Sequence, residues 1–232
     1  MTSFQTTCWT LVLTAGSGGE ADRKEALNKL CTAYWPPAYA YIRRRGNGDE
    51  ESRDLTQEFF ARLLEKNWLE SAVPERGKFR AFLLTMLKRF LANEHDFRTA
   101  EKRGGHTVIL PLELVGGLEV ADPSATPEQA YDRRWALTVM MRASARLHEE
   151  AVAAGKGPLF SALAPFIAAE PEPGVYEMTG AAFGMSKAAV GMAVHRMRLR
   201  LRELTRSEVA ETLSERGSVD AELQELMAAL RG

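Results

Sequence analysis

Apolar residues recur at helical spacing along most of the chain, most clearly between Phe79 and Leu91. Seven of them stand at i, i+3, i+4, i+7, i+8, i+11 and i+12, namely Phe79, Phe82, Leu83, Met86, Leu87, Phe90 and Leu91. Positions with this spacing share one face of an α-helix. We therefore predict a helix whose apolar stripe, including its three phenylalanines, lies in a core.

The chain before this stripe predicts two more helices. In residues 21–45 the apolar positions again repeat at helical spacing, but Pro36-Pro37 predicts a break or kink in the middle. The glycine-rich residues 46–48 end the segment. The next helix is expected from Asp49 to about Asn67, with acidic residues in its first turn, where the helix dipole favours them.

Helical periodicity is lost from Gly104 to Pro127, where two glycine pairs and three prolines predict a linker between domains. Helices resume at Glu128, and Pro158 can open a further helix at its first turn. The tail after Ser207 carries apolar residues at near-helical spacing, which predicts one or two amphipathic helices.

Residues 175–204 predict a helix-turn-helix. A short helix would run from Val175 to Phe183, Gly184 would end it with a positive φ, and Ser186 would cap the next helix. The second helix, from about Lys187 to Leu204, has an apolar inner face and is nearly free of acidic residues. A short helix followed by a longer basic one is the arrangement that places a recognition helix in the major groove. The alternative is that the arginines of this second helix form only a solvent-exposed surface without a binding role.

The predicted fold class is therefore all-α, with two small helical domains joined by a flexible linker. A chain of 232 residues is long enough for two domains that each bury a core. We expect an N-terminal helical domain at residues 1–103 and a linker at 104–130. A four-helix domain with the helix-turn-helix is expected at 131–206, followed by an acidic helical extension at 207–232.

Charge is segregated along the chain, although the net charge is only -1. Residues 49–70 are acidic, residues 76–103 and 187–206 are basic, and the tail beyond Ser207 is acidic again. Because nucleic acid responds to local positive potential, two basic blocks predict two contacts with a polyanion. The same segregation argues against a helical scaffold that has no role with nucleic acid.

Patterns typical of catalysis or metal binding are not evident. We find no glycine-rich phosphate loop, nucleophile motif or pair of carboxylates typical of an active site, so no enzyme is predicted. Cys8 and Cys31 lack CxxC spacing and the histidines are scattered, which argues against a disulfide framework, a metal site or a cofactor. No apolar run is long enough for a membrane span and the N-terminus lacks signal-peptide features, so a soluble cytoplasmic protein without membrane contact is expected.

Three segments resemble the extracytoplasmic-function (ECF) group of the sigma-70 family, and in particular a branch common in myxobacteria and planctomycetes. Asp54 to Leu64 is similar to the polymerase-binding helix of the family, with its D-L-x-Q-E-x-F core. Phe79 to Glu94 is similar to the helix that melts and reads the minus-ten promoter element. Phe183 to Ser186, together with His195 to Arg198, resembles the domain that reads the minus-thirty-five element. Such a protein is a sigma factor, which directs core RNA polymerase to promoters and helps to melt them for transcription initiation.

The resemblance implies three sets of binding residues. Contact with the β′ coiled-coil and the β subunit of bacterial RNA polymerase core would use Arg53, Asp54, Gln57, Glu58 and Arg62. Contact with the minus-ten element of promoter DNA would use Arg76, Lys78, Arg80, Lys88, Arg89 and Asn93. Contact with the minus-thirty-five element would use Ser186, Lys187, Gly191, His195, Arg196 and Arg198. An anti-sigma factor or another regulator stays open as a further partner.

The start of the expected recognition helix departs from the usual family pattern. Ala188, Ala189, Gly191 and Met192 offer few hydrogen-bonding groups, so direct base readout is expected to be sparse. Gly191 would permit a close approach to DNA. A rival interpretation of the whole chain is a helix-turn-helix regulator that binds an operator without polymerase. The acidic extension also has two interpretations, since its apolar face could cover the C-terminal domain or cap the DNA-binding surface as an autoinhibitory element.

Overall fold

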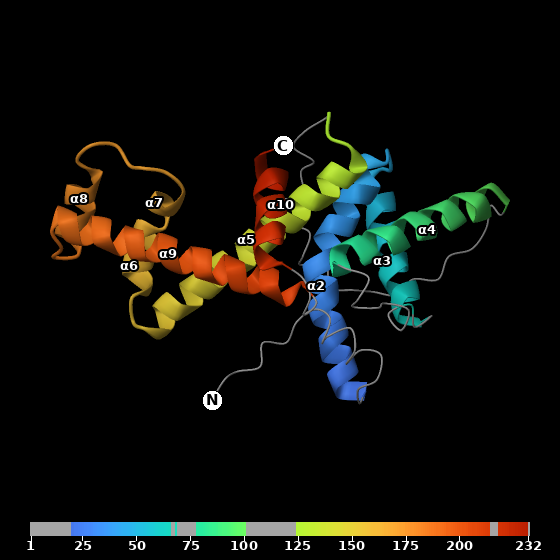
Figure 1. The fold of residues 1–232 in the computed structure, drawn as a ribbon, viewed down its shortest axis with the longest axis horizontal. Coiled ribbons are helices and arrows are strands. Elements are labelled where there is room, and N and C mark those ends of the chain that lie inside the picture. Colours follow the sequence, from blue (N-terminus) through green and yellow to red (C-terminus); the bar gives the residue numbers. More distant parts are fainter. Residues whose placement is uncertain (1–19, 66–67, 69–77, 101–123, 214–217, 232) are drawn as a thin grey trace. The chain divides into compact units, whose positions relative to one another are not determined.

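The computed structural model describes residues 20–65, 68, 78–100, 124–213 and 218–231, and every regular element in this part of the chain is helical. The predicted all-α class is thus confirmed for the described residues. The helices are, in chain order, α2 (Glu20–Arg44), α3 (Asp49–Glu65), α4 (Phe79–Ala100), α5 (Pro127–Ala153), α6 (Gly157–Leu163), α7 (Pro165–Ala168), α8 (Val175–Ala182), α9 (Lys187–Glu211) and α10 (Val219–Arg231) (Figure 1).

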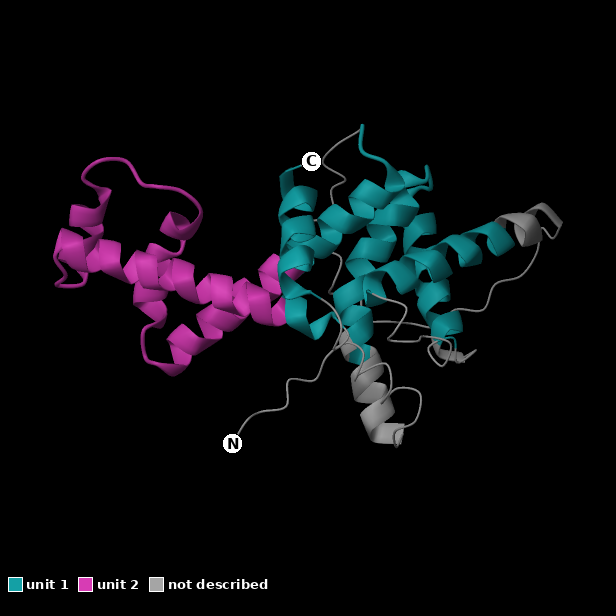
Figure 2. Cartoon of the chain, viewed as in Figure 1, with its two compact units in different colours: residues 1–138, 209–232 teal, residues 139–208 magenta. Residues whose placement is uncertain are grey.

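The described residues form two compact units (Figure 2). Unit 1 takes its residues from 1–138 and 209–232, and unit 2 consists of residues 139–208. Both boundaries fall inside continuous helices, α5 and α9, and not in the predicted linker. Most of that linker lies outside the described residues. The acidic extension expected at residues 207–232 is not separate from the two units. Its first residues continue α9, and its helix α10 belongs to unit 1.

α2 crosses the core of unit 1 without the break that its prolines predicted. It is a single helix from Glu20 to Arg44, and residues 33–42 are all buried, Pro36 and Pro37 included. A proline inside a helix removes a backbone hydrogen bond and crowds the preceding turn. Here the burial of large neighbours such as Tyr34, Tyr39 and Ile42, each at most 1% exposed, offsets that loss. Of the two predicted alternatives, the break is wrong because tertiary packing outweighs local propensity, and the kink stays a prediction.

α4 presents its predicted apolar stripe to the core of unit 1. Phe79 and Phe90 are each 1% exposed, while Phe82 is half-buried. The ring of Tyr34 in α2 packs edge-on against Phe79, with 5.2 Å between the ring centroids. Phe59 in α3 lies 5.6 Å from Phe90. Aromatic contacts therefore join all three N-terminal helices, as expected for large rings at a core.

α5 begins with a reciprocal cap. The hydroxyl of Thr126 accepts a hydrogen bond from the backbone N–H of Gln129 at 3.2 Å, and the side chain of Gln129 accepts one from the N–H of Thr126 at 2.7 Å. Pro127 suits the first helical position, where a backbone N–H has no partner within the helix. This cap starts α5 at residues 127–130, which were predicted to end the linker.

The core of unit 2 is built along the inner face of α9. Val190 and Val194 pack with Leu163 of α6 in one cluster, and Leu204 packs with residues of α5 in a second cluster. Met197 lies between these ends and contacts both clusters. The predicted inner face of this helix is confirmed. The single helix expected after Pro158 is divided into α6 and α7, with a proline near the start of each.

The turn between α8 and α9 depends on two glycines and one cap. Gly184 adopts a φ of 62°, the left-handed conformation that was predicted for it. The hydroxyl of Ser186 accepts a hydrogen bond from the N–H of Ala189 at 3.2 Å, so the predicted N-cap is also present. The closest approach is at Gly180, where a Cβ atom would overlap the backbone carbonyl oxygen of Met185. Gly180 therefore allows the backbone of α8 to approach the turn before α9 closely.

We predict that Gly180→Ala destabilises the protein by about 1–3 kcal/mol, because the new methyl group overlaps backbone that cannot easily move. Gly191→Ala is a matched control in the same unit, since a Cβ there would only reach ordinary contact with Tyr176 at 3.8 Å. It should leave stability unchanged or raise it by up to about 1 kcal/mol through helix propensity. Thermal unfolding followed by circular dichroism measures both, and equal stability of the two variants would contradict the packing argument.

Candidate functional site

The outer face of α3 carries the residues predicted to bind polymerase. Asp54 is exposed, and the partly exposed Arg53 forms an ion pair with Asp49 one turn earlier, with Nε and Oδ2 3.0 Å apart. Gln57 is half-buried, and its amide nitrogen makes no hydrogen bond to any described residue. Glu58 lies on the same side of the helix as Asp54, one turn further on. These four residues form a mixed-charge surface, which we call the α3 surface.

Arg62 differs from the rest of this set because it joins two helices. Its guanidinium pairs with Glu58 of α3 and with Glu94 of α4, each at 2.6 Å. It also lies over the ring of Phe90, with its Cζ atom 5.3 Å from the ring centroid. Burial lowers the pKa of Arg62, but the two carboxylates that pair with it outweigh this effect and leave the pKa raised. Arg62 therefore has a structural role, whatever else it contacts.

The residues predicted to bind the minus-ten element do not share one surface of α4. Arg89 and Asn93 are exposed. Lys88 forms an ion pair of 2.7 Å with Glu128 at the start of α5, and both side chains are 44% exposed. Arg76 lies outside the described residues. Lys78 and Arg80 are held by acidic side chains from elsewhere in unit 1.

Arg80 is buried, with an exposed fraction of 8%. It occurs three and seven residues before Leu83 and Leu87, and so shares the buried face of α4 with them. The guanidinium lies over the indole of Trp135, 4.5 Å from its ring centroid. The backbone carbonyl of Arg80 accepts a hydrogen bond from the hydroxyl of Tyr131 at 3.1 Å. The residue is therefore part of the packing between α4 and α5.

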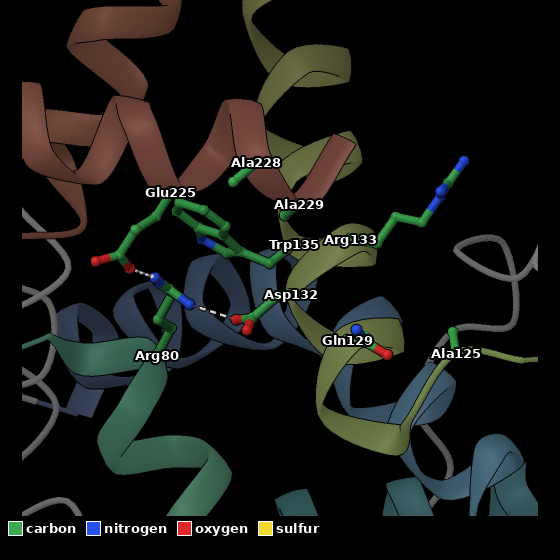
Figure 3. Close-up of a pocket in the computed structure, with 9 residues that line it drawn as sticks. All are labelled: Arg80, Ala125, Gln129, Asp132, Arg133, Trp135, Glu225, Ala228 and Ala229. Carbon is green, nitrogen blue, oxygen red and sulfur yellow. Dashed lines mark hydrogen bonds and ion pairs between the residues drawn. The ribbon is translucent and has the colours of Figure 1, made fainter. Parts of the chain in front are cut away.

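Three carboxylates surround the Arg80 guanidinium. Asp132 comes from α5 and Glu225 from α10 (Figure 3). The third, Glu222, also belongs to α10. The Nε atom of Arg80 lies 2.6 Å from Glu222 Oε1, and Glu222 is fully buried. A buried guanidinium remains charged, so it needs such partners. Together with Lys78, these residues form what we call the Arg80 cluster.

Lys78 completes the cluster from the residue before α4. Its ammonium lies 2.5 Å from a carboxylate oxygen of Glu222 and 2.5 Å from one of Glu225. Burial lowers the pKa of Lys78, but hydrogen bonds to the two glutamates reverse this and leave it raised. The hydrogen bond from Lys78 also lowers the pKa of Glu225. The pKa of Asp132 is raised by its burial, even though Arg80 opposes the shift.

A cavity of about 300 Å³ opens beside this cluster. Its lining includes Arg80, Asp132, Trp135 and Glu225, and Figure 3 shows them converging from α4, α5 and α10. The indole nitrogen of Trp135 is buried and makes no hydrogen bond to any described residue. Packing between these helices is thus looser on the side of the cluster that faces the cavity.

The residues predicted to bind the minus-thirty-five element lie on α9 and its cap. His195 and Arg196 are exposed, and Lys187 pairs with Glu177 of α8 at 2.8 Å while remaining 65% exposed. Nothing packed in unit 2 requires Gly191 to lack a side chain. These residues and Ser186 lie along the first turns of α9.

Arg198 is held away from the exposed face of α9 by hydrogen bonds to α7 and the residues that follow it. Its guanidinium donates to the carbonyl oxygens of Phe166 at 2.6 Å and Ile167 at 3.2 Å, and pairs with Glu170 at 2.6 Å. Carbonyls at the end of a helix lack partners within it, so Arg198 satisfies groups that would otherwise be unpaired. The outward face of α9 is mixed, because Met192 and Leu199 are 56% and 43% exposed beside the exposed His195 and Arg196.

Two acidic sites were not found from the sequence. One is the pair Glu222 and Glu225, which stand three residues apart on one side of α10 beside Leu226. The other is Glu208, 3% exposed, which pairs with Arg142 at 2.9 Å and with Arg146 at 2.7 Å. In both cases the only signal in the sequence is an acidic residue at a helical position next to buried apolar ones.

The described residues give little support for membrane insertion, metal binding or a reactive cysteine. None of the described helices has an apolar stretch that could cross a membrane. Described His, Cys, Asp and Glu residues form no group arranged to hold a metal ion. Burial raises the pKa of the Cys31 thiol to about 12, so the thiol stays protonated and unreactive at neutral pH.

Comparison with known proteins identifies the class of the N-terminal helices. Residues 30–99 match the family model of Sigma-70 region 2, a segment that covers most of α2 and all but the last residue of α4. This match supports a sigma factor of the sigma-70 family, with a role in RNA polymerase binding and promoter recognition during transcription initiation. No curated protein and no solved structure gave a significant match to the chain.

We predict that Arg62→Ala lowers the free energy of unfolding by about 1–3 kcal/mol, because Glu94 would be left buried without its partner. Arg53→Ala is the control on the same helix, since its ion pair is exposed and such pairs contribute at most about 1 kcal/mol. Urea unfolding measures both variants. If Arg62→Ala lowers the free energy of unfolding no more than Arg53→Ala does, the contact between α3 and α4 does not depend on Arg62.

Proposed function

We propose that this protein is a sigma factor of the ECF group that directs core RNA polymerase to particular promoters and helps to melt them. The observation that carries the proposal is the match of residues 30–99 to Sigma-70 region 2, because these residues include most of α2, all of α3 and nearly all of α4. The ECF group and its myxobacterial and planctomycete branch are inferred from the sequence resemblance described above.

In this proposal the α3 surface binds the β′ coiled-coil of the polymerase. Asp54 is exposed and Arg53, Gln57 and Glu58 lie around it, so the surface offers both charges and an amide. Complementary charge is well suited to fix the orientation of a partner helix. Arg62 would act mainly by holding α3 against α4, which keeps this surface in place.

Promoter contact is divided between the two basic blocks. For the minus-ten element, Arg89 and Asn93 are exposed on α4, and Lys88 is partly exposed beside them. For the minus-thirty-five element, α8 and α9 would act as the helix-turn-helix, with Lys187, His195 and Arg196 toward the DNA. The exposed cations of α9 favour contacts with phosphates, and exposed apolar residues such as Met192 favour thymine methyl groups over base-specific hydrogen bonds.

The proposal is tested by transcription in vitro with purified bacterial core polymerase and by mapping of the start sites. We predict that Asp54→Ala combined with Gln57→Ala weakens binding to core polymerase by roughly tenfold or more, a loss of about 1.4 kcal/mol. Glu149→Ala is the control, because it removes an exposed acid from α5 in unit 2. Affinity is measured by titration of labelled protein with core polymerase.

Specific transcripts that depend on the added protein are the expected result. If the protein binds duplex DNA tightly by itself and does not co-purify with core polymerase, the rival interpretation of a regulator that acts without polymerase is correct. For the upstream contact, Arg196→Ala should reduce promoter-specific transcription, whereas Lys156→Ala, at an exposed position before α6, should not.

A further inference from the structure

Helix α10 occupies two cationic groups, Lys78 and Arg80, that the sequence resemblance assigns to promoter DNA. Glu222 and Glu225 together contact both Lys78 and Arg80, and Lys78 lies 2.5 Å from a carboxylate oxygen of each. Carboxylates and phosphates bind lysine and arginine through the same charge-assisted hydrogen bonds. In this arrangement a phosphate group cannot reach Arg80 without displacing a glutamate.

We propose that α10 is an intramolecular competitor of nucleic acid, which neutralises Lys78 and Arg80 in the free protein and must be displaced before single-stranded DNA can bind them. The proposal rests on the proposed function, and it adds Lys78 and Arg80 to the minus-ten contacts given there for α4. It concerns only unit 1, to which α4 and α10 both belong.

The attachment of α10 combines ion pairs with apolar packing, in which Leu226 is buried and Leu223 and Leu230 are half-buried. Of its 13 residues only Glu222 and Leu226 are buried. An isolated helix of this length is marginal in water, so α10 needs its contacts with unit 1 in order to stay folded. Because a glutamate supplies half of its buried residues, salt or a competing polyanion should weaken the attachment.

Lys78 and Arg80 differ in how much of each side chain is exposed to solvent while α10 is bound. The side chain of Lys78 is 30% exposed in the presence of α10, so it can meet a phosphate first. That of Arg80 is 10% exposed and is reached only after Glu225 moves. Glu225 is itself 51% exposed, which makes it the carboxylate most easily exchanged. A stepwise exchange of Glu225 for a phosphate is therefore the route that the geometry favours.

Exchange of Glu225 for a phosphate would leave the net charge of the Arg80 cluster unchanged, because a carboxylate and a backbone phosphate each carry one negative charge. Three carboxylates, from Asp132, Glu222 and Glu225, face the two cations. Burial is the main reason why the pKa of Asp132 is raised, and the nearby negative charges of Glu225 and Glu222 add to the shift. Loss of Glu225 from the cluster would leave Asp132 and Glu222 to balance Lys78 and Arg80.

The test measures binding of a fluorescein-labelled single-stranded oligodeoxynucleotide of mixed sequence to the full chain by fluorescence anisotropy, without polymerase. Glu225→Gln should tighten binding roughly threefold or more, and Glu222→Gln combined with Glu225→Gln should tighten it further. The slope of log affinity against log salt should steepen by about one for each additional phosphate that the protein binds. Thermal unfolding verifies that each variant is folded. Glu225→Gln is the decisive variant, because a substitution at a half-exposed position disturbs the fold less than one at the buried Glu222.

Two controls separate a specific effect from a general loss of negative charge. Glu50→Gln removes an exposed acid from the first turn of α3 and should leave oligonucleotide affinity nearly unchanged. Lys78→Gln added to Glu225→Gln should abolish the increase in affinity, because the freed cation is then absent. Hydrogen exchange of the wild-type protein should show that amide protection in α10 falls when the oligonucleotide binds.

Unchanged or weaker oligonucleotide binding by Glu225→Gln would overturn the proposal, and so would full amide protection of α10 in the complex. In either case α10 would be a permanent structural part of unit 1. No binding by the wild-type protein or any variant would overturn it as well, and would also remove Lys78 and Arg80 from the proposed DNA contact. Failure of polymerase binding alone would contradict the proposed function while leaving the result for α10 intact, because no polymerase is present in this assay.

Discussion

A guanidinium group does not lose its proton in a protein, so a chain that buries an arginine must bring negative charge to it. Burial of Arg80 in α4 imposes this requirement on unit 1. The requirement is met by Asp132 of α5 and by Glu222 and Glu225 of α10, while the indole of Trp135 covers the face of the guanidinium. The positions of three helices that are far apart in sequence therefore depend on one cation.

The helices were largely predictable because their apolar periodicity is strong. Val190, Val194 and Leu204 lie in the core of unit 2, where their spacing placed them, and the turn before α9 has its predicted cap and left-handed glycine. The continuous helix through Pro36 and Pro37 was not predictable, because a local rule cannot weigh the tertiary burial of ten successive residues. The start of α5 was also misplaced, since a proline was taken as part of a linker when it opens a helix.

The candidate site was less predictable, because the sequence shows charge but not which charges meet. Arg80, Lys88 and Arg198 were all counted as basic surface, yet each is engaged by acidic groups or carbonyls from other helices. For Arg80 a signal was present, since its spacing from Leu83 and Leu87 places it on the buried face. Its partners Glu222 and Glu225 lie more than 140 residues away, beyond the reach of any local pattern.

The Arg80 cluster also bears on what counts as one domain of this protein. The segment that matches Sigma-70 region 2 ends at residue 99, but the carboxylates and the indole that surround Arg80 come from residues 132 to 225. A fragment cut at the boundary of the match would keep the buried cation and lose every one of these partners. Unit 1 is therefore discontinuous in sequence, and a fragment meant to preserve the surroundings of Arg80 has to include α10 and the start of α5.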